Sequence, residues 1–222
     1  ATDDDLRKPQ VSPDGTQLVA QSFRDGSWHI VLLDAADLTR TQLTAGTFDA
    51  RDPTWSPAGD TIYFASDQAG NYDIWALGLA TLKLRRLTTG PGDDFAPTVA
   101  GDELVFISTQ RRTPALYTLD LTKAAAQPQP LAPAPSGRVI AARLSPDGRR
   151  LAYVEAYERS GFPGVAMNRL VMLERSTGST RTLSPADSDV FSMPPAWLSN
   201  RELLYTADGE VKLANLGDQS DD

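Results

Sequence analysis

The chain has 222 residues, of which 41% are hydrophobic, and it carries a formal net charge of −8 and no cysteine. This content suffices for a sizeable core, whereas the acidic balance argues against nucleic acid and anionic lipid as partners, because phosphate contacts need clustered lysine and arginine. Disulfides and thiol chemistry are excluded, and no apolar run approaches the roughly 20 residues of a transmembrane helix, so we expect no direct membrane insertion.

A short turn motif recurs along the chain at intervals of about 44 residues. Its copies are Ser12-Pro13-Asp14-Gly15, Ser56-Pro57-Ala58-Gly59, a shortened Ala100-Gly101-Asp102-Glu103, Ser145-Pro146-Asp147-Gly148 and a degenerate Trp197-Leu198-Ser199-Asn200. Each copy precedes a short apolar run. A repeat of this length built from short strands predicts a β-propeller, in which each repeat forms one blade.

The second copy shows the four strands expected of one blade. We place the inner strand at 53–55, the second at 61–66, the third at 72–77 and the outer strand at 83–88. Proline and glycine between the first two strands suit a tight turn, and the polar residues between the next two suit a hairpin loop. The same register puts equivalent third-strand residues into one column: Ile30, Ile74, Leu116 and Leu170.

The whole chain, 1–222, is therefore expected to be a single all-β propeller domain of about five four-stranded antiparallel blades. The approximate limits are 7–50, 51–94, 95–138, 139–192 and 193–222, the last without its outer strand. No segment has sustained helical periodicity, so little helix is expected. Because an unclosed ring exposes two sheet edges, we expect either a part of a six-bladed or larger propeller or an unusual five-bladed ring.

This pattern resembles the PD40 family of WD40-like, TolB-like propeller repeats. The resemblance is carried by Pro53-Thr54-Trp55-Ser56-Pro57-Ala58-Gly59, Asp73-Ile74-Trp75 and Arg86-Leu87-Thr88, and extends more loosely beyond Pro97. The Gly-His and Trp-Asp pairs of true WD40 repeats are absent. The resemblance implies a periplasmic or otherwise exported protein with a role in envelope protein interactions.

The proline-rich segment 124–135 could be a linker between domains. The repeat continues in register beyond it, however, with Pro130-Leu131-Ala132 at the place of Arg86-Leu87-Thr88. We therefore interpret the segment as a long loop followed by the outer strand of the third blade, since edge strands tolerate proline.

No catalytic or metal-binding constellation is evident. His29 is the only histidine and falls inside a third strand, and no Gly-x-Ser-x-Gly motif accompanies it. The spacing of Asp67, Asn71 and Asp73 does not match a calcium loop and is better explained as a hairpin loop. We therefore expect no catalytic residues, no metal and no cofactor.

Propeller topology brings the loops that enter the inner strands and the loops between second and third strands to one face. These loops are rich in arginine, aromatic and acidic residues, which are enriched at protein interfaces, although ordinary charged loops are the alternative. An insertion at 155–166 lengthens the fourth blade and favours binding. The candidate partner-binding residues are Arg24, Arg51, Asp52, Asp94, Phe95, Arg111, Arg112, Arg143, Tyr157, Arg159 and Phe162.

From these features we expect a non-catalytic TolB-like propeller scaffold that binds a protein or peptide partner in the cell envelope; the sequence specifies no oligomeric state. Two alternatives remain open: the propeller domain of a larger hydrolase, such as an amidohydrolase or a prolyl-oligopeptidase-like enzyme, and the sensor domain of a membrane-anchored regulator.

Overall fold

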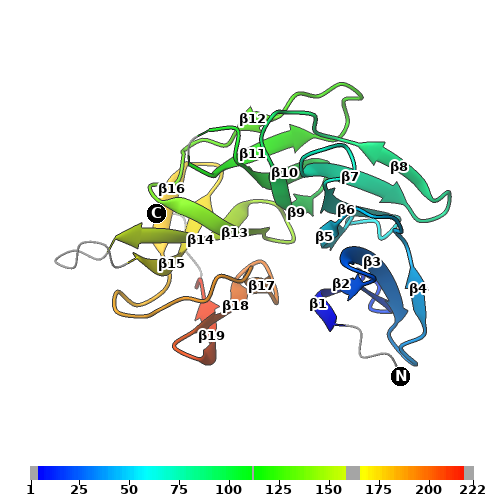
Figure 1. Ribbon diagram of the computed structural model, residues 1–222. Coiled ribbons are helices and arrows are strands. Elements are labelled where there is room, and N and C mark those ends of the chain that lie inside the picture. The colour runs from blue at the N-terminus through cyan, green and yellow to red at the C-terminus, as the bar shows by residue number, and fades with distance from the viewer. Residues whose placement is uncertain (1–4, 112, 159–165, 218–222) are drawn as a thin grey trace.

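The computed structural model describes residues 5–111, 113–158 and 166–217, and every regular element in these ranges is a β-strand. Figure 1 shows antiparallel sheets that follow one another around a common centre. The expected all-β propeller is confirmed, with four blades of four strands and a fifth of three. The described residues contain no helix long and apolar enough to span a membrane.

Within each blade the strands pair with their neighbours in chain order. Blade 1 contains β1 (Asp5–Val11), β2 (Gln17–Arg24), β3 (Ser27–Asp34) and β4 (Arg40–Gln42). Blade 2 contains β5 (Ala50–Trp55), β6 (Thr61–Ser66), β7 (Asp73–Gly78) and β8 (Lys83–Arg86). Blade 3 contains β9 (Asp94–Ala100), β10 (Glu103–Ser108), β11 (Ala115–Asp120) and β12 (Gln129–Pro130). Blade 4 contains β13 (Arg138–Leu144), β14 (Arg150–Glu158), β15 (Ala166–Glu174) and β16 (Ser179–Thr182). Blade 5 contains β17 (Ala196–Trp197), β18 (Glu202–Ala207) and β19 (Glu210–Asn215).

The recurring turn owes its shape to its serine and its glycine. The Ser12 hydroxyl donates a hydrogen bond of 2.6 Å to the Asp14 carboxylate and accepts one of 2.9 Å from the N–H of Gln17. Ser145 makes equivalent contacts in blade 4. In blade 2, where Ala58 replaces the aspartate, the Ser56 hydroxyl donates to Asp60 instead and accepts from the N–H of Thr61. The glycine has a φ between 69° and 75° in the three full copies, a conformation that strains other residues.

The predicted column of third-strand residues forms the buried centre of each of the first four blades, with at most 1% of each residue exposed. In three blades, a hydroxyl residue just after the outer strand accepts a hydrogen bond from the column residue's N–H, at 2.9–3.1 Å. The acceptors are Thr44, Thr88 and Ser184. In blade 2, β8 ends at Arg86, two residues before the expected limit.

The proline-rich segment is part of the propeller, as predicted. Its strand β12 pairs with β11, and Leu131 donates from its backbone N–H to the carbonyl of Leu116 at 2.8 Å. The strand begins one residue earlier than expected. Proline is tolerated at Pro130 because β12 is the outermost strand of its sheet.

The hydrophobic core lies between successive blades rather than within one layer. Blades 1 and 2 share a cluster around Phe64, and blades 2 and 3 share one around Phe106. Blades 3 and 4 pack around Leu151, and blades 4 and 5 around Leu203. Within the described ranges no such cluster joins blade 5 to blade 1, which stand at the two ends of the arc of blades (Figure 1).

Blade 5 has an apolar face turned away from blade 4. Leu203 and Tyr205 point toward blade 4, so the alternation along β18 and its partner puts Val211 and Leu213 on the opposite face. These two side chains are 70% and 55% exposed. The face that a propeller blade ordinarily packs against a neighbour is therefore open to solvent here.

Candidate partner-binding site

Each of the first three inner strands carries a bulge at the same place in the repeat. Lys8, Asp52 and Ala96 occupy it with φ values of 52°, 54° and 52°, and a proline follows each of them. The pairing register shifts at these points. A non-glycine residue in this region costs about 1–3 kcal/mol, and such strain is concentrated at functional sites. The bulge re-aims the three side chains, and all three residues line a central cavity.

Asp52 connects three blades at the level of the bulges. Its carboxylate forms an ion pair with the Lys8 ammonium group of blade 1. The other carboxylate oxygen accepts a hydrogen bond of 3.2 Å from the N–H of Ala96 in blade 3, and the N–H of Asp52 donates to Gln21 Oε1 at 2.9 Å. The strained backbone is therefore held by polar contacts to both neighbouring blades.

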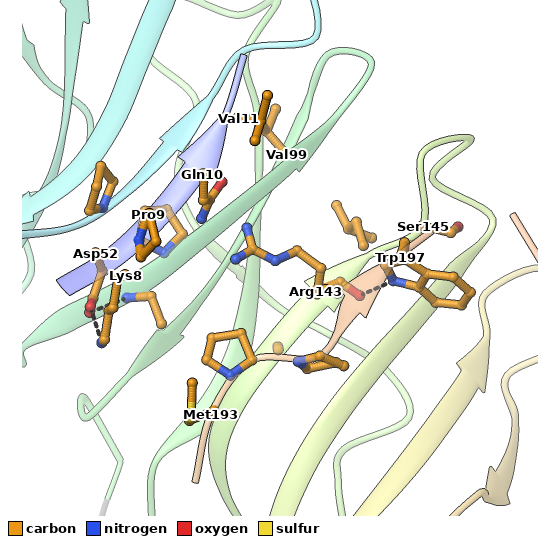
Figure 2. A pocket seen from close by; sticks show the side chains of 18 of the residues that line it. Lys8, Pro9, Gln10, Val11, Asp52, Val99, Arg143, Ser145, Met193 and Trp197 are labelled. Carbon is orange, nitrogen blue, oxygen red and sulfur yellow. Dashed lines mark hydrogen bonds and ion pairs between the residues drawn. The ribbon is translucent and has the colours of Figure 1, made fainter. Parts of the chain in front are cut away.

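The central cavity has a volume of about 660 Å³ and is lined by residues from the inner-strand segments of all five blades. This volume lies within the range of pockets that hold small molecules or short peptide segments. Prolines and Trp197 form much of the wall, and Figure 2 shows Lys8 and Asp52 at one side and Trp197 at the other. The wall is thus rigid and mostly apolar.

Arg143 carries a positive charge into this cavity. Figure 2 shows its guanidinium group pointing away from β13 toward Gln10. Its Nη1 donates a weak hydrogen bond of 3.4 Å to Thr54 Oγ1, which belongs to blade 2. Burial lowers the pKa of Arg143 to about 10, and the charge of Asp52 opposes this shift. The group is therefore still cationic at neutral pH.

A second group of side chains lies where the inner strands begin, at the face of the entering loops. This Trp28 cluster consists of Arg7, Trp28, Asp49, Arg51 and Tyr72. The guanidinium carbons of Arg7 and Arg51 lie 5.2 and 5.7 Å from the Trp28 ring, and that of Arg51 lies 5.8 Å from the Tyr72 ring. The two arginine side chains are 61% and 41% exposed, so the cationic rim of the cluster faces solvent.

Asp49 holds the Trp28 cluster together. Its carboxylate accepts hydrogen bonds from the backbone N–H of Trp28 at 2.8 Å, the Tyr72 hydroxyl at 2.9 Å and the Arg51 guanidinium at 2.5 Å. Burial alone would raise the pKa of Asp49, but these donors lower it below the ordinary value. Burial and the bond to Asp49 raise the pKa of Tyr72 to about 12. The cluster is thus a preorganised surface with its charges fixed at neutral pH.

The repeated sequence corresponds to a known family. The family model described as PD40, TolB beta propeller domain, matches residues 4–216. The chain belongs to this family. The sequence has no match among curated proteins.

Solved structures of TolB share the propeller fold. TolB from Acinetobacter baumannii is 22% identical with a TM-score of 0.70, over 97% of this chain and 55% of that one. Putative TolB from Agrobacterium tumefaciens is 19% identical with a TM-score of 0.73, over 94% and 73%. A puromycin-hydrolyzing peptidase from Mycobacterium tuberculosis is 18% identical with a TM-score of 0.68, over 98% and 37%. The chain thus spans about half of the Acinetobacter TolB.

In this TolB-type propeller, four of the predicted interface residues lie at the loop face. Arg51 belongs to the Trp28 cluster. Arg24 is exposed at the end of β2 and pairs with Asp25 at 3.7 Å, and Arg111 is exposed after β10. Tyr157 is half-buried, with the Arg169 guanidinium 4.9 Å from its ring. Arg112, Arg159 and Phe162 lie outside the described residues, as do residues 159–165 of the inserted loop.

Four other predicted residues are not at the loop surface. Asp52 and Arg143 line the cavity. Asp94 is fully buried, and Phe95 packs half-buried against the core clusters on either side of blade 3. The loop-face placement of these four residues is therefore corrected, because the inner strands begin earlier than the repeat suggested and bulge partway along.

Sequence reasoning did not select Trp28 and Tyr72 as site residues. Tyr72 is the first residue of the predicted third strand at 72–77, and Trp28 directly precedes His29 in blade 1. Their position at the loop end of a third strand, opposite the start of the next inner strand, was the available signal.

His29 and Asp73 hold equivalent positions in the third strands of blades 1 and 2 and are 5% and 0% exposed. Burial lowers the pKa of His29. Asp73 pairs with Arg86 at 2.5 Å. The described residues contain no group of three or more histidine, cysteine, aspartate or glutamate side chains arranged to hold a metal.

Proposed function

We propose that this chain is a non-catalytic TolB-like scaffold that binds a protein or peptide partner in the cell envelope, with the partner seated on the Trp28 cluster and reaching into the central cavity. The observation that carries the proposal is the position of two exposed guanidinium groups over aromatic rings. Arg7 lies over Trp28, and Arg51 lies over both Trp28 and Tyr72. Tryptophan, tyrosine and arginine dominate binding energy at protein interfaces, and here their geometry is fixed before a partner arrives.

Preorganisation supports this role in energetic terms. Ordering a long arginine side chain on binding costs about 0.5–1.5 kcal/mol. Arg51 is already held by its ion pair with Asp49 and by two aromatic rings. Much of its side-chain entropy is therefore lost on folding rather than on binding. A partner that covers these rings gains contact area at a reduced entropic loss.

The experiment is affinity capture from an envelope extract of the source organism, followed by a binding titration with each captured protein. Trp28→Ala combined with Arg51→Ala should weaken a specific partner by about tenfold or more. Arg85→Ala, an exposed arginine on the outer strand β8, is the matched control and should leave affinity unchanged. Equal affinity for the cluster variant and the control would refute the proposed surface.

A second candidate function is the propeller domain of a larger hydrolase. It is favoured by the match to the mycobacterial peptidase, of which this chain covers 37%. The mass of the endogenous protein separates the candidates: a product far larger than 24.0 kDa that cleaves aminoacyl or peptidyl substrates would favour the hydrolase.

A further inference from the structure

The inner strands place one cation on an otherwise neutral ring of equivalent positions. Equivalent positions in the five inner strands are identified by their partners in the second strands, which are Val19, Tyr63, Val105, Ala152 and Leu204. The inner-strand residues at these positions are Gln10, Thr54, Thr98, Arg143 and Ala196. The backbone around Arg143 is held from both neighbouring blades. Its carbonyl accepts a hydrogen bond of 3.1 Å from Trp197 Nε1, and the following N–H donates to Thr98 Oγ1 at 3.1 Å.

The guanidinium group of Arg143 has no ionic partner among the described residues. The hydrogen bond to Thr54 is the only one that its side chain makes within them. The acid whose charge acts on it, Asp52, is already paired with Lys8 and accepts the N–H of Ala96. A guanidinium carries five N–H donors, and Figure 2 shows this group extending among the residues that line the cavity.

We propose that Arg143 is an anion subsite that binds a carboxylate group of the partner inside the central cavity. This inference rests on the proposed scaffold function and specifies the chemistry of the ligand. A guanidinium donates two parallel hydrogen bonds to a carboxylate, and the neighbouring amide of Gln10 supplies a neutral donor (Figure 2). Among the described residues of the cavity wall, Arg143 is the one cation without an ionic partner, since the Lys8 charge is neutralised by Asp52. One such charge matches a monoanion better than a phosphate dianion.

The cavity wall strengthens this preference. Pro9 and Pro53 line it and offer no backbone N–H to compete for an anion, and Ala142 adds only apolar surface. In so apolar a setting an uncompensated charge is unfavourable, so a carboxylate that reaches it gains more than it would at the surface.

The test is a titration of ¹⁵N-labelled protein with sodium acetate, with sodium chloride and inorganic phosphate at matched ionic strength. Acetate should shift the Arg143 Nε–Hε resonance saturably, and chloride should not. Arg143→Gln introduces the residue type that blade 1 has at this position, and it should weaken acetate binding by about tenfold or more. Arg138→Gln, an exposed arginine on the same strand, is the control. Equal acetate affinity in the wild type and Arg143→Gln, or a stronger response to phosphate, overturns the proposal.

Two glycine-rich pentapeptides identify the source of the carboxylate. One has a central aspartate and an amidated end, and the other has a central asparagine and a free carboxyl terminus. Tighter binding of either to the wild type than to Arg143→Gln supports the subsite and names its source; no difference for both overturns it. If acetate binds at Arg143 but partner affinity does not depend on the Trp28 cluster, only the proposed scaffold surface is refuted. If partner affinity depends on the Trp28 cluster but acetate does not bind, only the subsite is refuted.

Discussion

Trp55 of blade 2 donates a hydrogen bond of 3.1 Å from its indole Nε1 to the backbone carbonyl of Gln10 in blade 1. Trp197 makes the same contact from blade 5 to Arg143 in blade 4, also at 3.1 Å. The two tryptophans occupy the same position in the repeat. One indole thus ties each of these blades to the inner strand of the blade before it.

Replacing Trp55 with phenylalanine should lower the free energy of unfolding by about 1–3 kcal/mol, because the Gln10 carbonyl loses its indole donor beside a cavity. Trp75→Phe is the matched control. The Nε1 of Trp75 is buried without a hydrogen-bond partner among the described residues, so its removal should cost much less. Urea denaturation of both variants checks the prediction, and an equal loss in the two would contradict it.

Asp94→Asn should stabilise the protein at pH 7 by about 1–3 kcal/mol. Burial raises the pKa of Asp94, and neither carboxylate oxygen has a well-formed hydrogen bond within the described residues, although the Ser108 and Thr88 hydroxyls oppose the shift. Because the folded-state pKa lies above the unfolded one, the contribution of Asp94 to stability is greatest below the unfolded value of about 3.8 and falls as pH rises toward the folded pKa.

The stability of Asp94→Asn should therefore exceed that of the wild type at pH 7 and approach it near pH 3. Thermal melts across this range provide the measurement. Asp102→Asn, an exposed carboxylate after the same strand, serves as the control and should leave the pH profile of the wild type in place. A variant profile parallel to the wild type would show that Asp94 is not the group responsible.

Ala96→Gly should stabilise the protein by up to about 1 kcal/mol, because Ala96 holds a φ of 52° that glycine adopts without strain. The hydrogen bond from its N–H to Asp52 is retained in the variant. Ala100→Gly, at the end of the same strand, should instead lose stability through greater flexibility of the unfolded chain. Chemical denaturation should show a gain in the free energy of unfolding for Ala96→Gly and a loss for Ala100→Gly. Equal losses in the two variants would argue against strain at the bulge.

Thr88→Val should cost about 1–3 kcal/mol, because the N–H of Ile74 would lose its 2.9 Å acceptor inside the blade while side-chain volume is kept. Thr89→Val, at the exposed neighbouring position, should change stability little. The prediction is tested by comparing the denaturation midpoints of the two variants, provided that their free energies of unfolding depend on denaturant concentration with the same slope. Slow amide exchange at Ile74 should also be lost selectively in the first variant.

The blades could be predicted because their signals are local. The serine and glycine of each turn act within a few residues of one another, and in every full copy the serine hydroxyl accepts the N–H of the fifth residue after it. The third-strand column was also predictable, since alternation along a strand assigns its residues to faces without knowledge of the neighbouring blade. The pairing of the proline-rich segment with β11 could be predicted because the repeat continues in register beyond it.

The site was predicted only in outline. Counting along the repeat placed Asp52, Asp94 and Arg143 among surface loops, but the inner strands begin early and contain a bulge. A bulge adds one residue to one strand of a pair and so changes which face the following side chains take. The stacking of Arg51 between Trp28 and Tyr72 joins two blades, and no spacing within a single repeat encodes it.

The sequence by itself determined that this chain forms repeated four-stranded units and belongs with TolB-type propellers, because turn chemistry and strand alternation depend on neighbours in the chain. Only the tertiary structure decided that Arg143 faces a cavity in which no described residue forms an ion pair with it, while Asp94 is buried. Those environments are created by side chains contributed from other blades, and the energy of a charge depends on what surrounds it rather than on its place in the sequence.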